Sequence, residues 1–394
     1  MQNGVFQTGN PRWSAVFSLF MGVMALIAAE FIPVSLLTPI ARDLAVSEGM
    51  AGQTVTAVGV LAVLTSLLLA PLTGNTDRRR ILLAFSAMLV ASYMLIGMAP
   101  TYSIMLIGRA ILGICVGGFW SLASAVTLQL VPTKDVPRAL SIVYAGVSVA
   151  TIIALPVASW IGHLIGWRNV FFLGALMAAF GFVWQYRALP SLPARAGSGF
   201  RDMSALLRRT WILAGIGGNI LSFGGYHIFF TYLRPFLELD LARANTLSVI
   251  LLVFGWRTSS APSLRALLGN HFRSTMILVH LAFTAAALAL LLSQGHADIG
   301  IALAVFWGFA FGFTPVGWST WIARTLSDKA ELAGGLTVAA TQFAIGLAAA
   351  VGGFTYDNLG INGIFLAAAG ISVMAALLIA VSFSLFARDT GHKA

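Results

Sequence analysis

The run WSAVFSLFMGVMALIAAEFIPVSLLTPI, which extends from Trp13 to Ile40, contains a single ionisable residue, Glu30. A helix needs about 20 apolar residues to cross the hydrocarbon core of a bilayer, and this run is long enough to do so. It is also longer than the apolar core of a signal peptide, which has about 7–15 residues. We therefore expect it to be kept as a first membrane span.

The whole chain has the composition of a membrane protein. Of its 394 residues, 59% are hydrophobic and 9% are charged, and the mean hydropathy is +0.91. Soluble domains carry about 25% charged residues, so this composition excludes a soluble enzyme, a disordered chain and a disulfide scaffold. The apolar runs are far longer than the ~10-residue alternating strands of a membrane barrel. The remaining class is an all-α protein with several membrane spans.

Similar runs recur along the chain and predict twelve transmembrane helices. The first six cover 13–40, 50–73, 80–99, 104–131, 138–163 and 168–187, and the second six cover 211–234, 244–268, 275–294, 298–325, 333–356 and 361–387. We expect two six-helix bundles, 13–187 and 211–387, joined by a basic linker at 188–210, with tails at 1–12 and 388–394. Two such halves around a central site are typical of transporters.

The basic residues predict the orientation of these spans. The net charge is +10, which on a soluble domain would suggest nucleic acid. With both termini in the cytoplasm, however, the basic residues left outside are Arg42, Arg168, Arg234 and Arg243. Most of the others then lie in cytoplasmic loops, as the positive-inside rule requires.

Two charged residues inside predicted spans are candidates for coupling transport to protons. An ionised acid at the depth of Glu30 costs several kcal/mol, and such residues often mark a proton or substrate path. Arg109 starts the pattern Arg109-x-x-x-Gly113-x-x-x-Gly117, whose glycines favour close helix packing. The alternative for each is purely structural: a packing acid bonded to a neighbour, or an arginine in an ion pair.

Further candidates are polar, aromatic or helix-bending. The loop residues Asp77, Arg78, Arg79 and Arg80 form either a charge latch that changes during transport or a simple topology signal. Pro33 and Pro156 are expected to bend their helices. The candidate substrate ligands are polar or aromatic residues at membrane depth, and packing is the alternative for each: Trp120, Tyr226, His227, Tyr232, Trp318 and Gln342, with Asn219 and Trp307 as additional possibilities.

Several chemistries have no sequence support. The lysines Lys134, Lys329 and Lys393 do not follow a glycine, so the phosphate-binding loop G-x-x-x-x-G-K-[ST] is missing. The histidines show no ligand-like spacing, and one cysteine, Cys115, cannot form an internal disulfide. We expect no metal, no cofactor and no enzymatic activity.

These motifs resemble those of the major facilitator superfamily. The span pattern at Arg109 resembles its fourth-span motif, 73–80 (TGNTDRRR) resembles its loop between spans 2 and 3, and 154–159 (ALPVAS) resembles its antiporter motif. The loop departs by lacking the usual second glycine, and the antiporter motif has Leu155 and Ser159 in place of glycines.

Within that superfamily, other segments resemble the bacterial purine ribonucleoside exporters of the drug:proton antiporter family. They are 30–39 (EFIPVSLLTP), 166–171 (GWRNVF), 230–235 (FTYLRP), 315–322 (PVGWSTWI) and Asp357-Asn358. The resemblance covers about 11–387. It implies proton-driven export of inosine, guanosine and their analogues. We therefore expect a monomeric antiporter of the bacterial inner membrane with cytoplasmic termini, in which Glu30 carries the proton and Arg109 biases its affinity.

Three alternatives remain open at this stage. Sugar exporters share the acid–Phe–x–Pro–Val element, so an exporter of sugars or mixed drugs on the same fold is the nearest. A membrane-embedded enzyme would need clustered catalytic groups. A sensor or relic without transport is suggested by span 8, where Arg257 and Pro262 are poor choices for a membrane helix. We interpret 256–263 as two compensating frameshifts, because a reading frame shifted by one base permits an apolar stretch there; resequencing tests this.

Overall fold

The computed structural model describes residues 11–74, 76–132, 135–193, 206–240, 271–293, 296–326 and 330–390, and in these ranges all regular structure is helical. They contain 10 helices long and apolar enough to cross a membrane. Predicted span 8 (244–268), with Arg257 and the segment 256–263, lies outside the described residues, as do Lys134, Arg243, Lys329, Lys393 and the greater part of the linker.

The N-terminal half has one helix for each predicted span. These helices are α1 (Trp13–Ser35), α3 (Glu48–Thr73), α4 (Arg78–Gly97), α5 (Tyr102–Leu130), α6 (Val136–Ile165) and α7 (Trp167–Ala188). The first predicted run divides into α1 and the short helix α2 (Leu37–Asp43), with Leu36 between them. Pro33 lies in the last turns of α1 and Pro156 inside α6, so both are within helices, as expected.

The C-terminal half contains α9 (Thr210–Phe230), α10 (Leu233–Asp240), α13 (Phe272–Leu292), α14 (Ala297–Phe311), α15 (Phe313–Thr325) and α16 (Ala330–Thr390). Predicted span 10 is broken at Gly312 into α14 and α15. Helix α16 covers the last two predicted spans, and Gly360, with φ +63°, turns the chain between them. The described helices cover eleven of the twelve predicted spans, in agreement with the twelve-helix, two-bundle fold that the sequence predicts.

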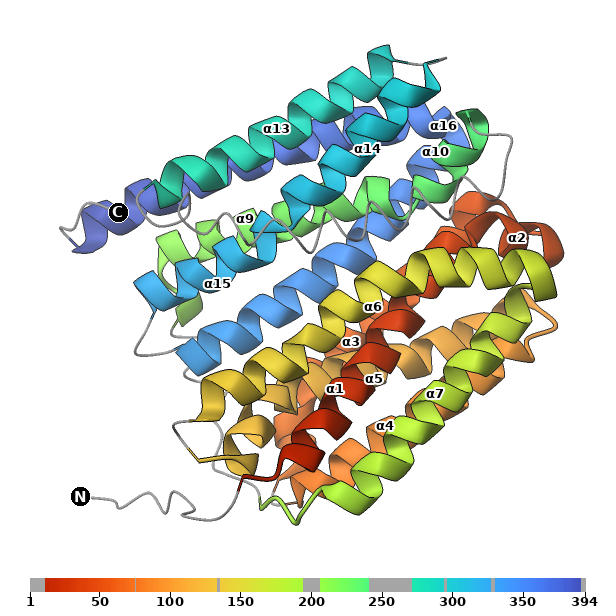
Figure 1. Ribbon diagram of the computed structural model, residues 1–394. Helices are drawn as coiled ribbons and strands as arrows, with labels where there is room; N and C mark the ends of the chain where they lie inside the picture. Colours follow the sequence, from red (N-terminus) through yellow and green to blue (C-terminus); the bar gives the residue numbers. More distant parts are fainter. Residues whose placement is uncertain are drawn as a thin grey trace.

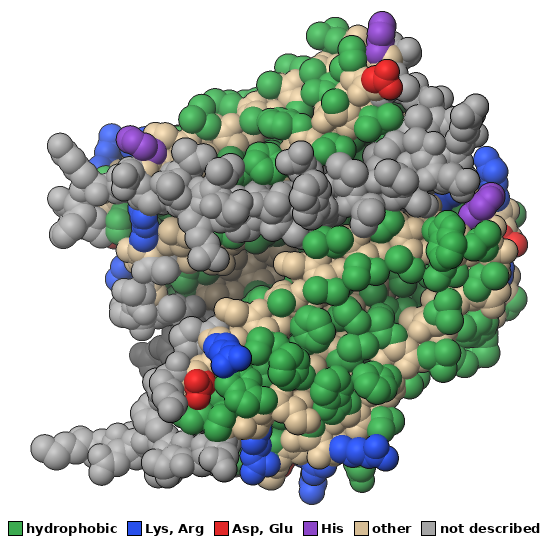
Figure 2. Space-filling view, in the orientation of Figure 1, with side chains coloured by type: hydrophobic (Ala, Val, Ile, Leu, Met, Phe, Trp, Pro, Cys, Tyr) green, Lys and Arg blue, Asp and Glu red, His purple; other side chains and the backbone are tan. Residues whose placement is uncertain are grey.

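The two halves pack against each other along α3 and α16, and they also come together at one end of the molecule. We call this end the closed end and define it by residues 36–47, 232–240 and 356–360. Figure 1 shows α2 and α10 together there, while both chain ends lie on the opposite side, the termini end. One apolar cluster includes residues of both halves, such as Val34 and Leu37 with Tyr226 and Phe229. Figure 2 shows a hollow between the halves toward the termini end and a broad hydrophobic outer surface, as expected for a lipid-facing wall.

Candidate functional site

Arg109 and Glu30 lie together in the interior of the N-terminal half. Arg109 is fully buried and Glu30 is 4% exposed. The guanidinium donates from Nε to the carbonyl of Thr54 at 3.0 Å and from Nη1 to the carbonyl of Ala29 at 2.6 Å. It therefore ties α5 to α3 and α1 and places a positive charge beside Glu30, whose carboxylate it influences electrostatically.

Pro33 explains why the carbonyl of Ala29 is free to bind Arg109. In a regular helix the N–H of residue 33 would donate to that carbonyl, but proline has no N–H. The unused acceptor is then taken by Arg109 of α5. A local irregularity of α1 thus creates the contact that holds the guanidinium next to Glu30.

Both charged groups keep polar atoms without protein partners. Among the described residues, Glu30 Oε1 and Arg109 Nη2 are buried and make no hydrogen bond. The described ion pairs, Arg168–Asp43 and Arg234–Glu238, lie elsewhere. An unpaired buried polar group is costly and needs an explanation, and a proton or ligand that comes and goes provides one.

Close helix packing surrounds this pair. A Cβ added at Gly113 would lie 2.8 Å from Leu61 Cβ of α3, and Gly117 lies against the backbone of Ala62. The glycine pattern that follows Arg109 therefore lets α5 approach α3, as its spacing suggests. The approach brings the Thr54 carbonyl within reach of the guanidinium.

An aromatic contact crosses between the halves beside Glu30. The rings of Phe31 and Phe230 meet edge to face, with centroids 5.3 Å apart. Phe230 also stacks on Tyr226 and contacts His227, whose rings belong to the same turn of α9. Sequence reasoning did not single out Phe31 or Phe230, although both lie in the segments that carry the family resemblance.

The predicted substrate ligands fall into separate places. Tyr226 and His227 are adjacent, with centroids 4.9 Å apart, and Tyr226 stacks on Phe311 at 3.5 Å. Trp120 of the other half stacks on Tyr144, with centroids 5.5 Å apart.

The other three ligands lie elsewhere. Tyr232 is at the closed end, where it stacks on Tyr356. Trp318 and Gln342 are buried in the C-terminal half, and the Trp318 ring packs on Trp321. The structure thus joins Tyr226 to His227, whereas the ring of Tyr232 stacks on Tyr356.

The closed end is held by polar contacts between the halves. Asp357 accepts from the Ser47 hydroxyl at 2.7 Å and from the N–H of Gly49 at 3.0 Å, and the Tyr356 hydroxyl donates to Glu48 at 2.8 Å. Here a carboxylate of one half caps the first turn of α3 in the other. The sequence motif Asp357-Asn358 gives no sign of this capping role.

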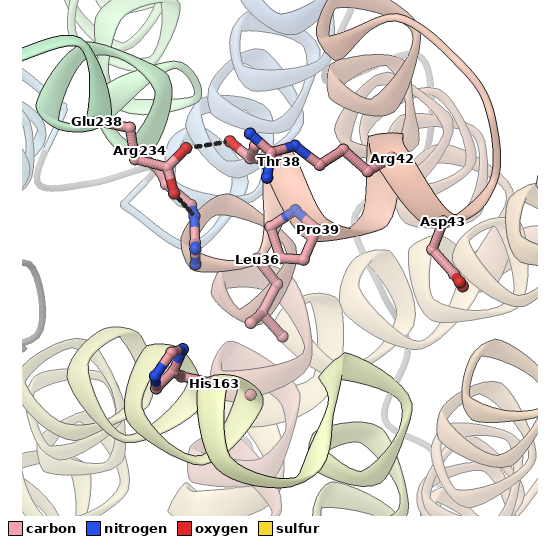
Figure 3. Close-up of a pocket in the computed structure, with 9 residues that line it drawn as sticks. Leu36, Thr38, Pro39, Arg42, Asp43, His163, Arg234 and Glu238 are labelled. Carbon is pink, nitrogen blue, oxygen red and sulfur yellow. Dashed lines mark hydrogen bonds and ion pairs between the residues drawn. The ribbon is translucent and has the colours of Figure 1, made fainter. Parts of the chain in front are cut away.

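A pocket of about 470 Å³ opens beside a second such contact. Figure 3 shows Glu238 between Thr38 and Arg234 on one wall and His163 opposite. Glu238 accepts from Thr38 at 2.6 Å across the halves and from Arg234 at 2.8 Å, and Arg234 also donates to the Ser35 carbonyl. The pocket residues thus help to close this end.

The predicted loop latch lies at the termini end, within one half. Asp77 caps α4 by accepting from the N–H of Arg79 at 2.8 Å, and it accepts from Ser191 at 2.6 Å and the N–H of Leu192 at 2.9 Å. Partial burial opposes ionisation of Asp77, but these hydrogen bonds outweigh it and hold its pKa below the ordinary value. Asp77 therefore fastens the chain that leaves α7 to the start of α4, together with Arg79, which donates to Tyr186.

Comparisons with known proteins agree with this architecture. The chain is 40% identical over 380 residues to the purine ribonucleoside efflux pump NepI of Salmonella paratyphi C and equally to that of Salmonella typhi, covering 94% of both chains in each case. Relatives with these names are transporters, in agreement with the prediction that the chain is not an enzyme.

Solved structures share the fold at 14–15% identity. They are the nucleoside transporter NupG (TM-score 0.76; 94% of this chain and 100% of that one) and a D-xylose–proton symporter (TM-score 0.79; 94% and 97%). A bacterial homologue of the lysosomal transporter Spinster, solved facing inward and unoccupied, has a TM-score of 0.73 over 95% of this chain and 96% of that one. The model of the Major Facilitator Superfamily matches residues 18–337, and the chain belongs to that family.

Proposed function

We propose that the chain exports purine ribonucleosides, such as inosine, guanosine and their analogues, across the bacterial inner membrane in exchange for protons. The observation that carries this proposal is the 40% identity to purine ribonucleoside efflux pumps along 94% of both chains. The exporter of sugars or mixed drugs is the less favoured alternative, because the sugar symporter resembles this chain at 15% identity and so shares the fold alone.

Glu30 is the proposed proton carrier, and Arg109 biases its affinity for the proton. The support is their burial, the unpartnered Oε1 of Glu30 and the nearby guanidinium. One proton that moves down 100 mV releases about 2.3 kcal/mol. Since 1.4 kcal/mol corresponds to a factor of ten, this supports a substrate gradient of roughly 50-fold for a neutral nucleoside.

Alternating access accounts for the asymmetry between the two ends. The distribution of basic residues, including Arg78, Arg79 and Arg80, supports a cytoplasmic location for the termini end. The closed end then faces outward, so this conformation loads substrate from the cytoplasm. The loop at 77–80 holds the chain after α7 against the start of α4, within the N-terminal half. We propose a monomer as the functional unit.

Uptake into everted membrane vesicles with an acidic lumen tests the proposal. Labelled inosine is expected to accumulate with the native chain and not with Glu30→Gln, because the glutamine cannot release a proton. Asp298→Asn, an exposed acid in the first turn of α14, is the matched control and is expected to transport normally. Absence of nucleoside uptake by native protein that is present in the membrane would refute the function, and full activity of Glu30→Gln would refute the role of Glu30.

A further inference from the structure

The joint between α1 and α2 repeats, at the closed end, the arrangement found beside Glu30. In a continuous helix the carbonyl of Ser35 would accept from the N–H of residue 39, but Pro39 has no N–H. Ser35 is fully buried, so its carbonyl needs another donor. Arg234 of α10 supplies it, because its Nη1 donates to the Ser35 carbonyl. A proline again frees a carbonyl, and an arginine again binds it.

The two arginines that bind these carbonyls belong to different halves of the molecule. Arg109 of the N-terminal half binds the carbonyl of Ala29. Arg234 of the C-terminal half binds the carbonyl of Ser35, six residues further along α1. Glu30 lies between the two contacts in the sequence. The helix that carries the proposed proton carrier is therefore fixed from both sides, and the contact with Arg234 crosses the boundary between the halves.

Glu238 holds the guanidinium of Arg234 in place. It accepts from Arg234 Nε at 2.8 Å and from the hydroxyl of Thr38 at 2.6 Å, so it also links α10 to α2. The side chain of Arg234 is 13% exposed and that of Glu238 is 31% exposed. Thr38, Pro39, Arg234 and Glu238 line one wall of the pocket in Figure 3. Water in this pocket can therefore replace the protein partners when the halves separate.

Opening of the closed end must break the bond between Arg234 and Ser35, because the two groups lie on opposite sides of the boundary. While the bond is intact, the end of α1 cannot move away from α10, and Glu30 stays beside Arg109. A proton-coupled exporter must not change sides while it is empty and deprotonated, since protons would then cross the membrane without exchange for substrate. A contact that keeps the empty protein closed prevents this leak.

We propose that Arg234 is a positioning residue for proton exchange. By holding the carbonyl of Ser35, it keeps the empty protein closed at this end and so prevents a proton leak through Glu30. This inference rests on the proposed role of Glu30 in export. It goes further because it names the residue by which the C-terminal half controls the helix that carries Glu30.

Decay of a pH gradient across everted vesicles tests the assignment in the absence of nucleoside. With an acidic lumen and a pH-sensitive dye, the native chain is expected to leak protons slowly. Arg234→Gln is expected to raise the leak about tenfold, the factor that one hydrogen bond from a charged donor supplies. Arg234→Lys keeps a charged donor, so a smaller rise is expected. Addition of Glu30→Gln to Arg234→Gln is expected to abolish the additional leak, because the proton then has no carrier.

Pro39→Ala tests the carbonyl itself and leaves Arg234 and Glu238 in place. The alanine N–H can donate to Ser35 within a continuous helix, so the carbonyl no longer needs Arg234 and the leak is expected to rise as well. The matched control is Arg42→Gln, which removes an exposed arginine from the same pocket. No hydrogen bond is found for Arg42 among the described residues, so the leak is expected to stay at the native rate.

An unchanged leak in either Arg234→Gln or Pro39→Ala would overturn the assignment, and so would an additional leak that persists with Glu30→Gln. If one of the two variants does not accumulate in the membrane, the other decides alone. Lack of inosine uptake by the native protein would instead refute the proposed function. The leak measurement needs no nucleoside, so it would still decide the role of Arg234.

Discussion

Removing the carboxylate of Asp357 is expected to open the closed end. Asp357 accepts two hydrogen bonds from the other half, at 2.7 Å from Ser47 and 3.0 Å from the N–H of Gly49. Capping a helix in this way contributes about 0.5–2 kcal/mol, and a negative charge near the helix N-terminus adds about 0.3–1 kcal/mol. Because Asp357 is exposed, we take about 2 kcal/mol in total, which changes the ratio of closed to open molecules about 30-fold.

Distances between two spin labels measure this ratio. The labels are attached to cysteines that replace Met98 and Leu359, which lie near the closed end, one in each half, and are 57% and 66% exposed. The native Cys115 is buried and is replaced by serine so that it does not take a label. Asp357→Ala is expected to increase the population with longer distances about 30-fold relative to the closed form. Asp357→Asn keeps an acceptor and loses the charge, so the expected change is about threefold.

The matched control is Asp298→Ala, which removes an exposed acid from the same half. It is expected to leave the distances unchanged, because no hydrogen bond to the other half is found for Asp298 among the described residues. If Asp357→Ala gives the same distance distribution as Asp298→Ala, the cap does not contribute to closure and the reasoning is wrong.

Two further predictions concern a helix crossing and a surface pair. Gly59→Ala is expected to reduce transport at least tenfold, since the added Cβ would lie 2.6 Å from the Cα of Gly346 in the other half. The control is Gly335→Ala, whose added Cβ would meet no atom within 4 Å. Equal uptake by the two variants would contradict the expectation. The hydrogen bond from Arg168 holds the pKa of Asp43 below its ordinary value. The Asp43–Arg168 pair therefore stabilises the fold fully when the pH is above the ordinary pKa of an aspartate, and this stabilisation is lost only as the pH falls through the lowered pKa. Asp43→Asn should therefore lower the melting temperature in detergent by the same amount at pH 5 and at pH 8. The expected decrease is about 1–2 °C, because a half-exposed ion pair contributes at most about 1 kcal/mol. A decrease that is seen at pH 8 and disappears at pH 5 would contradict this.

The overall fold was predictable because lipid imposes strong rules on sequence. Each span needs a long apolar run, and the twelve runs gave the helices and the two halves. Their ends were predicted less well where tertiary contacts decide them. The first run continues to Ile40 in hydropathy, yet α1 ends at Ser35, because the next residues form α2 and contact α10 of the other half.

The candidate site was predictable in its residue types and less so in its grouping. Glu30 and Arg109 stood out because charge is rare and costly at membrane depth. Tyr232 follows Tyr226 by six residues and has the same aromatic character, but it lies at the closed end, where its ring stacks on Tyr356. Hydropathy assigns a residue to a span but does not say which face of the helix meets the other half.

The contact that holds Arg109 depends on two features that the sequence shows only separately. Pro33 appears in the sequence as a helix bend and Arg109 as the start of a glycine pattern, with no sign that they are connected. In the structure, the missing N–H of Pro33 leaves the Ala29 carbonyl free, and Arg109 donates to it at 2.6 Å. The glycines after Arg109 matter to the same end, because they let α5 approach closely enough for the second bond, to Thr54. Proline, arginine and glycines thus work as one arrangement, and each has a stereochemical reason to be where it is.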